Sequence, residues 1–383
     1  MLKSRRTTAA AATPVPGRLE NTAAALRRLE HRWRCAYVRY LPPAILAHVD
    51  RPLRTLVGGL QRGVSAGFYL SQPLGSWSGR CAGRDVTLAM WGRPRDVEPL
   101  IQLLFDGEPR VRWHGHRSYT DALRYAAAPP PDTDMVVAAT TPVLASAFRR
   151  RGCLIVPATI RLGGQPETLA KLMGNADESL RSDLRLVRRS GYRLEVRQYS
   201  RPDSVTFYER YVVPHARTRF GNAASLPTFE WMDRSFASGF AILAWRAGAE
   251  DPDAILITVP RSDALWTAHL GTRDAEPSIM RRGGVAALYA FAIEVAADRG
   301  ADLLDMGRSR PWLADGVTRY KWKWGFRPFV DLGEPLEWAI RVVRADGAAA
   351  CRFLESRPIM RGGARFSMIG PDGLHDCGLM SAR

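Results

Sequence analysis

Residues 264–307 constrain the fold of this chain most, because strand and helix patterns follow one another there in a single unit. The segment 264–272 (ALWTAHLGT) has the composition of a strand. After a loop comes a helical pattern that Gly300 ends, and then a second strand pattern at 301–307. Strand and helix patterns that alternate in this way are typical of α/β folds.

The same alternation extends over much of the chain, so we predict a mixed α/β (α+β) protein with central mixed sheets flanked by helices. Further strands are predicted from residue 84 and at 135–139, 153–162, 240–247, 254–260 and 334–342. One helix is predicted within 167–200, stopped by Gly191 and followed by a strand. The predicted organisation is a disordered tail at 1–17, a basic helical extension at 18–83, a first domain at 84–200, a second domain at 201–345 and a tail at 346–383.

The composition favours anionic partners and a reducing compartment. Lys and Arg number 55 against 38 Asp and Glu, which gives a formal charge of +17. Such a charge attracts nucleic acid, anionic lipid headgroups or phosphate-bearing substrates without choosing among them. The five cysteines are scattered, with no CxxC pair, and His114 and His116 have no evident third ligand, so no metal site is predicted. No signal peptide or membrane-spanning run is evident, so a cytoplasmic location is expected.

The stretch GVTRYKWKWGF at 316–326 alternates bulky and charged residues. This alternation predicts a β-strand from Arg319 to Trp324, with aromatic side chains on one face and cations on the other. The simpler interpretation is an amphipathic strand with a solvated face. The alternative is a rigid strand that holds cationic side chains in place beside a reacting group.

A candidate anion site lies where the loop after residue 272 enters the following helix. The first N–H groups of a helix lack intrahelical partners, and glycines let a diphosphate approach the backbone closely. The spacing fits the acyl-CoA pyrophosphate signature Q/R-x-x-G-x-G/A of GNAT acetyltransferases. The predicted cofactor-binding residues are therefore Arg281, Arg282, Gly283, Gly284 and Ala286.

A longer resemblance covers about residues 165–330. The segment 288–325 resembles the C-terminal half of the GNAT-like domain of Fem-type peptidyltransferases and their acyltransferase relatives. The matching positions are Gly300, Asp305, Gly307, Ser309, Gly316, Arg319, Tyr320, Lys321, Trp324 and Gly325. Upstream, SDLRLVRRSGYRLEV resembles the helix before the second domain of that family, and TFYERYVVPHARTRFG resembles the helix that opens it.

This resemblance implies two GNAT-like units, the first of them divergent, and an N-acyltransferase that moves an acyl group from acyl-CoA to a primary amine. It implies that Lys321 and Arg319 face the cleft between donor and acceptor, where Lys321 would stabilise the oxyanion. Asp305 would orient or deprotonate the amine, or simply pair with nearby arginines. Two further catalytic residues are predicted, His215 as a base and Ser309 near Asp305. The predicted substrate-binding residues that remain are Arg308, Tyr320, Arg185 and Arg189.

Several alternatives remain open at this point. Fem enzymes that use aminoacyl-tRNA are expected to carry a long helical arm, and 190–280 shows no such pair of helices. An aminoacyl-tRNA-dependent peptidyltransferase is therefore the second hypothesis, and a non-catalytic polyanion-binding protein the third. The arginines of 181–189 form either a solvated face or a grip on the phosphate of a nucleotide-, glycan- or lipid-linked acceptor. Binding at the inner membrane face is a further expectation, whereas DNA binding is not expected.

Overall fold

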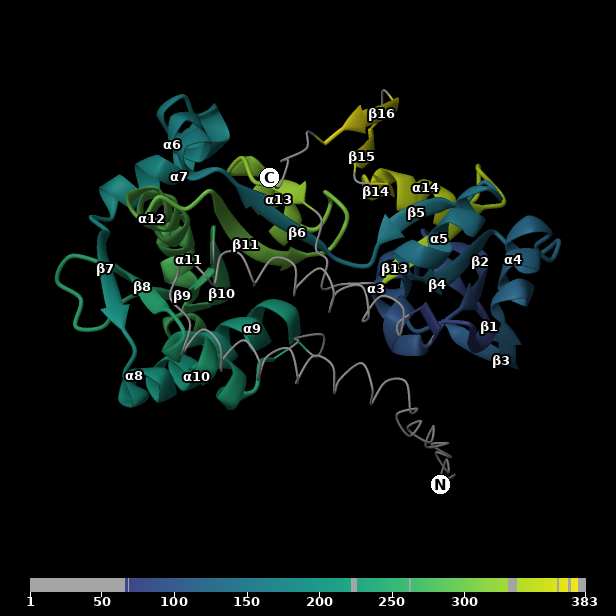
Figure 1. The fold of residues 1–383 in the computed structure, drawn as a ribbon, viewed down its shortest axis with the longest axis horizontal. Coiled ribbons are helices and arrows are strands. Elements are labelled where there is room, and N and C mark those ends of the chain that lie inside the picture. The colour runs from purple at the N-terminus through teal and green to yellow at the C-terminus, as the bar shows by residue number, and fades with distance from the viewer. Residues whose placement is uncertain are drawn as a thin grey trace, which may run out of the picture.

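The structure is a computed structural model that describes residues 66–67, 69–221, 226–261, 263–329, 336–363, 365–370 and 373–377. The predicted tail at 1–17 and the basic helical pattern that begins at residue 18 lie outside the described residues. Figure 1 shows two large sheets in separate lobes, the first on the right and the second on the left. The predicted mixed α/β fold class is confirmed.

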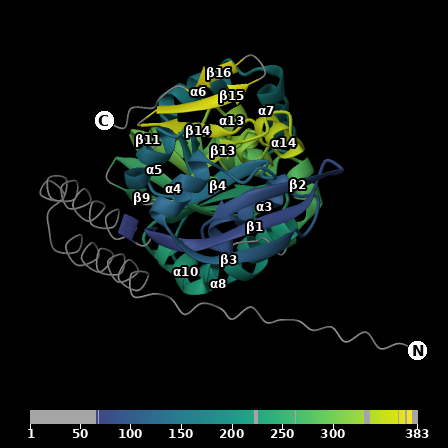
Figure 2. The same cartoon turned by 90° about the vertical axis from the view of Figure 1, so that its right-hand side faces the viewer.

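Among the described residues, six strands form the first sheet. Its order is β3 (Arg110–Ser118), β1 (Ser71–Cys81), β2 (Arg84–Trp91), β4 (Met135–Thr140), β13 (Glu337–Val342) and β5 (Leu154–Pro157). β2 and β4 are parallel, and the other neighbours are antiparallel. Figure 2 turns this lobe toward the viewer. Four of the described helices pack on it, namely α3 (Pro94–Leu104), α4 (Tyr119–Ala127), α5 (Pro142–Arg149) and α14 (Ala348–Glu355).

Among the described residues, seven strands form the second sheet. Its order is β12 (Arg327–Phe329), β6 (Ile160–Gly164), β11 (Leu303–Ser309), β10 (Ala264–Thr272), β9 (Ala254–Arg261), β8 (Phe240–Trp245) and β7 (Arg193–Gln198). β10 and β11 are parallel and are joined through α12 (Gly284–Asp298). A small antiparallel sheet of β14 (Ile359–Gly362), β15 (Arg365–Gly370) and β16 (Gly373–Asp376) lies in the predicted C-terminal tail.

Alternation along the strands gives the second sheet an apolar core on each face. Phe240, Ile242 and Ala244 of β8 pack in the cluster that holds α12, whereas Ala241 and Leu243 pack in the cluster on the other face. The first face is also covered by α6 (Pro166–Gly174) and α7 (Glu178–Arg189). The second is covered by α8 (Arg201–Thr206), the π-helical turn η1 (Phe207–Val212), α9 (Val213–Phe220) and α10 (Phe229–Ala237).

Sheet membership departs from the order that the predicted domains imply. β1 is a strand within 18–83, so the helical prediction was wrong for its residues. β6 and β7 lie before residue 200 but belong to the second sheet, whereas β13 belongs to the first. β13 completes the first sheet because it pairs with both β4 and β5. The chain thus crosses to the second sheet after β5 and returns to the first with β13.

One helix prediction also needs correction. The helix predicted within 167–200 is two helices, α6 and α7, because Asp177 caps a new start by accepting the N–H of Leu180 at 2.8 Å. Within 201–220 the helix is continuous through Pro214, and its π-helical turn η1 lies just before that proline. A proline lacks the N–H that the preceding turn would use, and the wider turn accommodates this loss.

The alternating stretch at 316–324 is a helix, α13 (Gly316–Lys323), and the strand prediction was wrong. Asp315 starts the helix by accepting the N–H groups of Val317 and Thr318, each at 3.0 Å. Thr318, Lys321 and Trp324 follow at intervals of three and are all buried, which is the spacing of one helix face. Lys321 therefore lies on the buried face, whereas Arg319 is exposed.

Candidate active site

The candidate site lies where β10 and β11 separate. Within the described strands, their pairing stops at Trp266 and Asp305, although β10 continues to Thr272 and β11 to Ser309. β10 carries a bulge against β9 between Thr267 and His269, and β11 shifts register against β6 just beyond Asp305. The two strands thus present backbone groups that do not pair with each other, and an extended ligand could bond to such edges.

Lys321 reaches the end of β11 from α13, and only 5% of its surface is exposed. Its Nζ lies 3.2 Å from the carbonyl oxygen of Gly307, 3.1 Å from that of Arg308 and 2.9 Å from Oγ of Ser309. These three acceptors would occupy all three hydrogens of a charged ammonium. A charged Lys321 would therefore have no hydrogen left for a developing oxyanion, which argues against the predicted stabilisation of an oxyanion.

The surroundings of Lys321 favour its neutral form. Burial lowers the pKa of the Lys321 amine to about 7, and the charge of Arg161 acts in the same direction, while Asp305 and Asp315 oppose them. A lysine with such a pKa is partly neutral near pH 7. It can accept a proton where an ordinary lysine cannot.

Asp305 is buried and already engaged. Its carboxylate pairs with the guanidinium of Arg161 on β6 and accepts the N–H of Gly307 at 2.9 Å. The guanidinium carbons of Arg161 and Arg261 lie 5.6 and 4.0 Å from the ring centre of Trp266. Asp305 therefore fits the pairing alternative better than the role of a base. The ion pair with Arg161 ties β11 to β6 four residues before Ser309.

His215 stands apart from this group in the described contacts. Its Nδ1 lies 2.9 Å from Oγ1 of Thr272, at the far end of β10. Burial, with a smaller effect from Arg219, lowers the pKa of His215 to about 4. The near-neutral pKa expected of a histidine base is therefore not what the structure shows, although the imidazole is neutral at pH 7.

The residues predicted near the substrate are not brought together. Arg308 and Arg319 are exposed. Tyr320 packs edge-on against Tyr289, with ring centres 5.1 Å apart, and so belongs to the helix packing. On α7, Arg185 and Arg181 both pair with Glu178, whereas Arg189 is exposed. Arg181 instead lines a groove of about 590 Å³ between α6, α7 and α12 that Lys321 does not reach.

The predicted anion site at the start of α12 is largely covered by the chain itself. Arg281 ends α11 (Pro277–Arg281) and is exposed, but Gly283, Gly284 and Ala286 are buried. Gly283 has φ +85°, a left-handed conformation that glycine adopts most easily, and a Cβ on it would lie 3.1 Å from Cβ of Leu186. Packing therefore explains these glycines, and only Arg281 is free to meet a phosphate at the surface.

Substituting Gly284 tests that interpretation. A Cβ at this position would lie 2.6 Å from Cγ2 of Ile279 and 3.1 Å from the hydroxyl of Tyr192. We expect Gly284→Ala to lower the free energy of unfolding by ~1–3 kcal/mol, the usual cost of overpacking. Urea denaturation measures it. A stabilised variant, the normal result of Gly→Ala inside a helix, would show that the position is not tightly packed.

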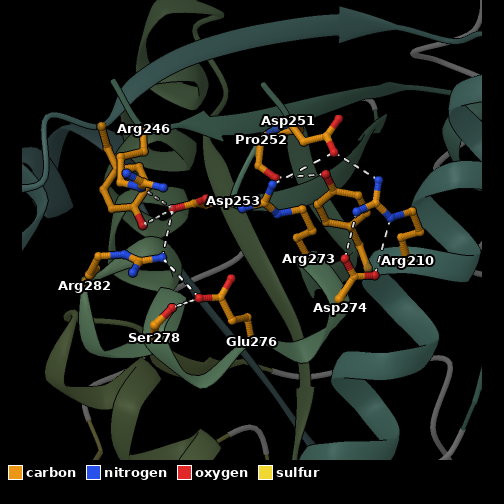
Figure 3. Close-up of polar contacts among 12 residues, drawn as sticks. Arg210, Arg246, Asp251, Pro252, Asp253, Arg273, Asp274, Glu276, Ser278 and Arg282 are labelled. Atoms are coloured by element: carbon orange, nitrogen blue, oxygen red, sulfur yellow. Dashed lines mark hydrogen bonds and ion pairs between the residues drawn. The ribbon is translucent and has the colours of Figure 1, made fainter. Parts of the chain in front are cut away.

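Arg282, the second predicted phosphate ligand, belongs to an ionic cluster that sequence reasoning missed (Figure 3). Its centre is Asp253, whose side chain is fully buried. Asp253 accepts from the hydroxyl of Tyr192 at 2.9 Å, from Arg246 at 3.3 Å and from Arg273 at 3.2 Å, and Arg282 lies 3.9 Å away. Glu276, Asp251, Asp274 and Arg210 extend the cluster outward. It joins the end of β10 to the start of α12.

Within the described ranges, no three His, Cys, Asp or Glu side chains gather as a metal-binding group. None of the described helices has the length and hydropathy of a bilayer-spanning segment.

Comparison with known proteins finds similar structures but no matching sequence. No family model and no curated protein matches the chain. One similar solved structure is L-PGS from Bacillus licheniformis, with 14% identity, a TM-score of 0.37 and coverage of 78% of this chain and 92% of that chain. FemX has 10% identity and a TM-score of 0.36, with coverage of 71% and 85%. A tandem GNAT protein from the clavulanic acid biosynthesis pathway has 13% identity and a TM-score of 0.30, with coverage of 74% and 86%.

These structural neighbours include the GNAT and Fem types that the sequence motifs resemble. Likeness this distant concerns the fold alone. The function is therefore argued from the side chains of this chain.

Proposed function

We propose that this protein transfers an acyl group from a thioester donor of the acyl-CoA type to a primary amine. The observation that carries the proposal is the contact of 2.9 Å between Lys321 Nζ and Ser309 Oγ. Both residues are buried, and they lie beside the Asp305–Arg161 ion pair at the end of β11. A basic amine next to a hydroxyl supplies the proton transfer that acyl transfer requires.

The separation of β10 and β11 supports the thioester donor. The pantetheine arm of CoA is extended and carries amide groups, which can bond to strand edges in the way an added strand does. Its thioester end would then reach Ser309, and its phosphates would extend toward the surface, where Arg281 is exposed. The acceptor amine would enter from the Ser309 side, on a small amino-acid-like molecule or on an envelope or polysaccharide precursor.

Native mass spectrometry with a series of acyl-CoAs, followed by product detection with a panel of amines, tests the proposal. We expect a bound acyl-CoA and an N-acylated product, with release of one free thiol for each amide formed. Hydrolysis without amide formation, or neither binding nor product across the panel, would contradict the proposal.

Arg281 provides a separate test of the donor. We expect Arg281→Glu to weaken CoA binding by ~1–3 kcal/mol, because a charge-assisted hydrogen bond to phosphate is lost. Isothermal titration calorimetry measures this affinity. Arg150→Glu makes the same charge change at an exposed arginine in the other lobe and should leave the affinity unchanged. Equal losses in both variants would indicate attraction by net charge, and no loss in Arg281→Glu would place the phosphates elsewhere.

A further inference from the structure

We infer that the acyl group passes through a covalent ester on Ser309, with Lys321 as the group that activates the serine hydroxyl. This inference rests on the proposed acyl transfer and goes beyond it. Direct transfer needs no protein nucleophile, whereas this route makes Ser309 a catalytic residue that bonds to the substrate.

The three contacts of Lys321 fit a charged ammonium, and they also fit the valence of a neutral amine. A neutral lysine has two N–H groups and one lone pair, and two of its contacts are carbonyl oxygens, which can only accept. If the two hydrogens point to Gly307 and Arg308, the lone pair points to Ser309. The 2.9 Å contact in which a charged Lys321 Nζ donates to Ser309 Oγ would then be reversed, with the serine hydroxyl as donor. A serine and a basic lysine in this relation form a known type of nucleophile and base pair.

Both members of the pair are held in place. Ser309 lies on β11 opposite Ile160 of β6 and is 8% exposed. Lys321 is fixed through α13, whose first turn is capped by Asp315 and whose Thr318 hydroxyl donates to the carbonyl oxygen of Arg310 at 2.6 Å. Rigid elements on both sides keep the nitrogen and oxygen at reacting distance.

The charged groups around Lys321 shift its pKa and so influence the pH at which the amine becomes neutral. Arg161 on β6 disfavours its protonation, whereas Asp305 on β11 and Asp315 at the start of α13 favour it. Because Asp305 already pairs with Arg161, the stabilisation that Asp305 gives to the protonated amine is partly cancelled. Burial is the largest effect, and it favours the neutral amine.

The proposed steps balance as follows. Ser309 Oγ attacks the thioester carbonyl and its proton moves to Lys321 Nζ. The C–S bond breaks, and the thiolate leaves as a thiol with that proton. An acceptor amine in its free-base form then attacks the ester. The C–Oγ bond breaks, the attacking nitrogen gives up one of its two protons through Lys321 to Ser309 Oγ, and the amide keeps the other.

A fluorophosphonate ester tests the pair without knowledge of the donor, because it phosphonylates an activated serine with loss of fluoride. We expect peptide mass spectrometry of the wild-type protein to find the adduct on Ser309. The rate of labelling should rise with pH through about 7, as Lys321 loses its proton. Ser309→Ala should give no adduct there, and Lys321→Met should label at least ~100-fold more slowly.

Lys323→Met is the matched control. Lys323 lies on the same helix but pairs with Asp183 at 2.7 Å, so labelling of Ser309 should be unchanged. A folded wild-type protein without the adduct, or equal labelling in Lys321→Met, overturns the inference. The wild-type result and its pH dependence hold even if a variant fails to fold.

Kinetics separate this inference from the proposed function. Amide formation at the wild-type rate in Ser309→Ala would overturn the covalent route while leaving acyl transfer intact. A Ser309 adduct without amide formation from any acyl-CoA would leave the activated serine supported and contradict the proposed donor.

Discussion

Replacing Lys321 with methionine is expected to lower turnover by ~10²–10⁴-fold, the range for loss of a general acid–base group. Methionine keeps most of the volume but can accept no proton from Ser309. Donor affinity should change little, because the loss falls on the transition state. Steady-state kinetics at saturating donor measure both quantities. In the wild-type protein turnover should rise with pH through about 7, because the neutral amine is the active form. The variant should lack this rise.

The control for this variant is again Lys323→Met, which removes a charge from the same helix but keeps the Lys321–Ser309 contact. Circular dichroism shows whether each variant is folded. Equal losses of turnover in both variants would mean that α13 contributes a general positive charge. Full turnover in Lys321→Met would remove this lysine from the mechanism.

Replacing Asp253 with alanine is expected to have the largest effect on stability. The carboxylate is fully buried and accepts hydrogen bonds from Tyr192, Arg246 and Arg273. Removing it leaves partly buried guanidinium groups without their partner, which typically costs ~3–5 kcal/mol of unfolding free energy. Urea denaturation measures the change. Asp253 connects the turn before β9 to the segments that flank α12. The urea concentration at the midpoint of unfolding should therefore fall markedly.

Asp274→Ala is the comparison within the same cluster. Asp274 pairs with Arg210 but is 55% exposed. Exposed pairs contribute little, so its loss should cost only ~0–1 kcal/mol. If Asp253→Ala lowered the free energy of unfolding no more than Asp274→Ala does, the cluster in Figure 3 would not hold these segments together.

Much of the second sheet could be predicted because its signals are local. β8, β9, β10, α12 and β11 all lie where the apolar patterns predicted them. α12 is apolar on nearly every side, and such a helix has to be buried. The alternation of strand and helix there sufficed for the fold class.

The stretch at 316–324 was misread because two periods overlap in it. Its aromatic and charged residues alternate with period two, while Thr318, Lys321 and Trp324 recur every third residue. Asp315, whose carboxylate caps the helix, was the signal that decides between them. The return of β13 to the first sheet left no local signal, because its pairing with β4 joins segments about 200 residues apart.

Three of the predicted site residues lie close together, and their roles stay predictions. Lys321, Asp305 and Ser309 were all chosen from the motif resemblance, and α13 and β11 place them together. Arg161 was missed because it lies about 140 residues before Asp305, on a strand with no distinctive motif. The partners of Asp253 were missed for the same reason, since they come from separate turns.

The charge state of Lys321 is the most direct test of the account. Incorporating lysine labelled with ¹³C at the ε-carbon and following that resonance by NMR gives the pKa, and Lys321→Met assigns the signal. We expect a midpoint near 7 for Lys321, because burial outweighs the nearby carboxylates. A midpoint near ~10.4, the ordinary value for lysine, would contradict it, because a permanently charged Lys321 could only anchor α13 to the end of β11.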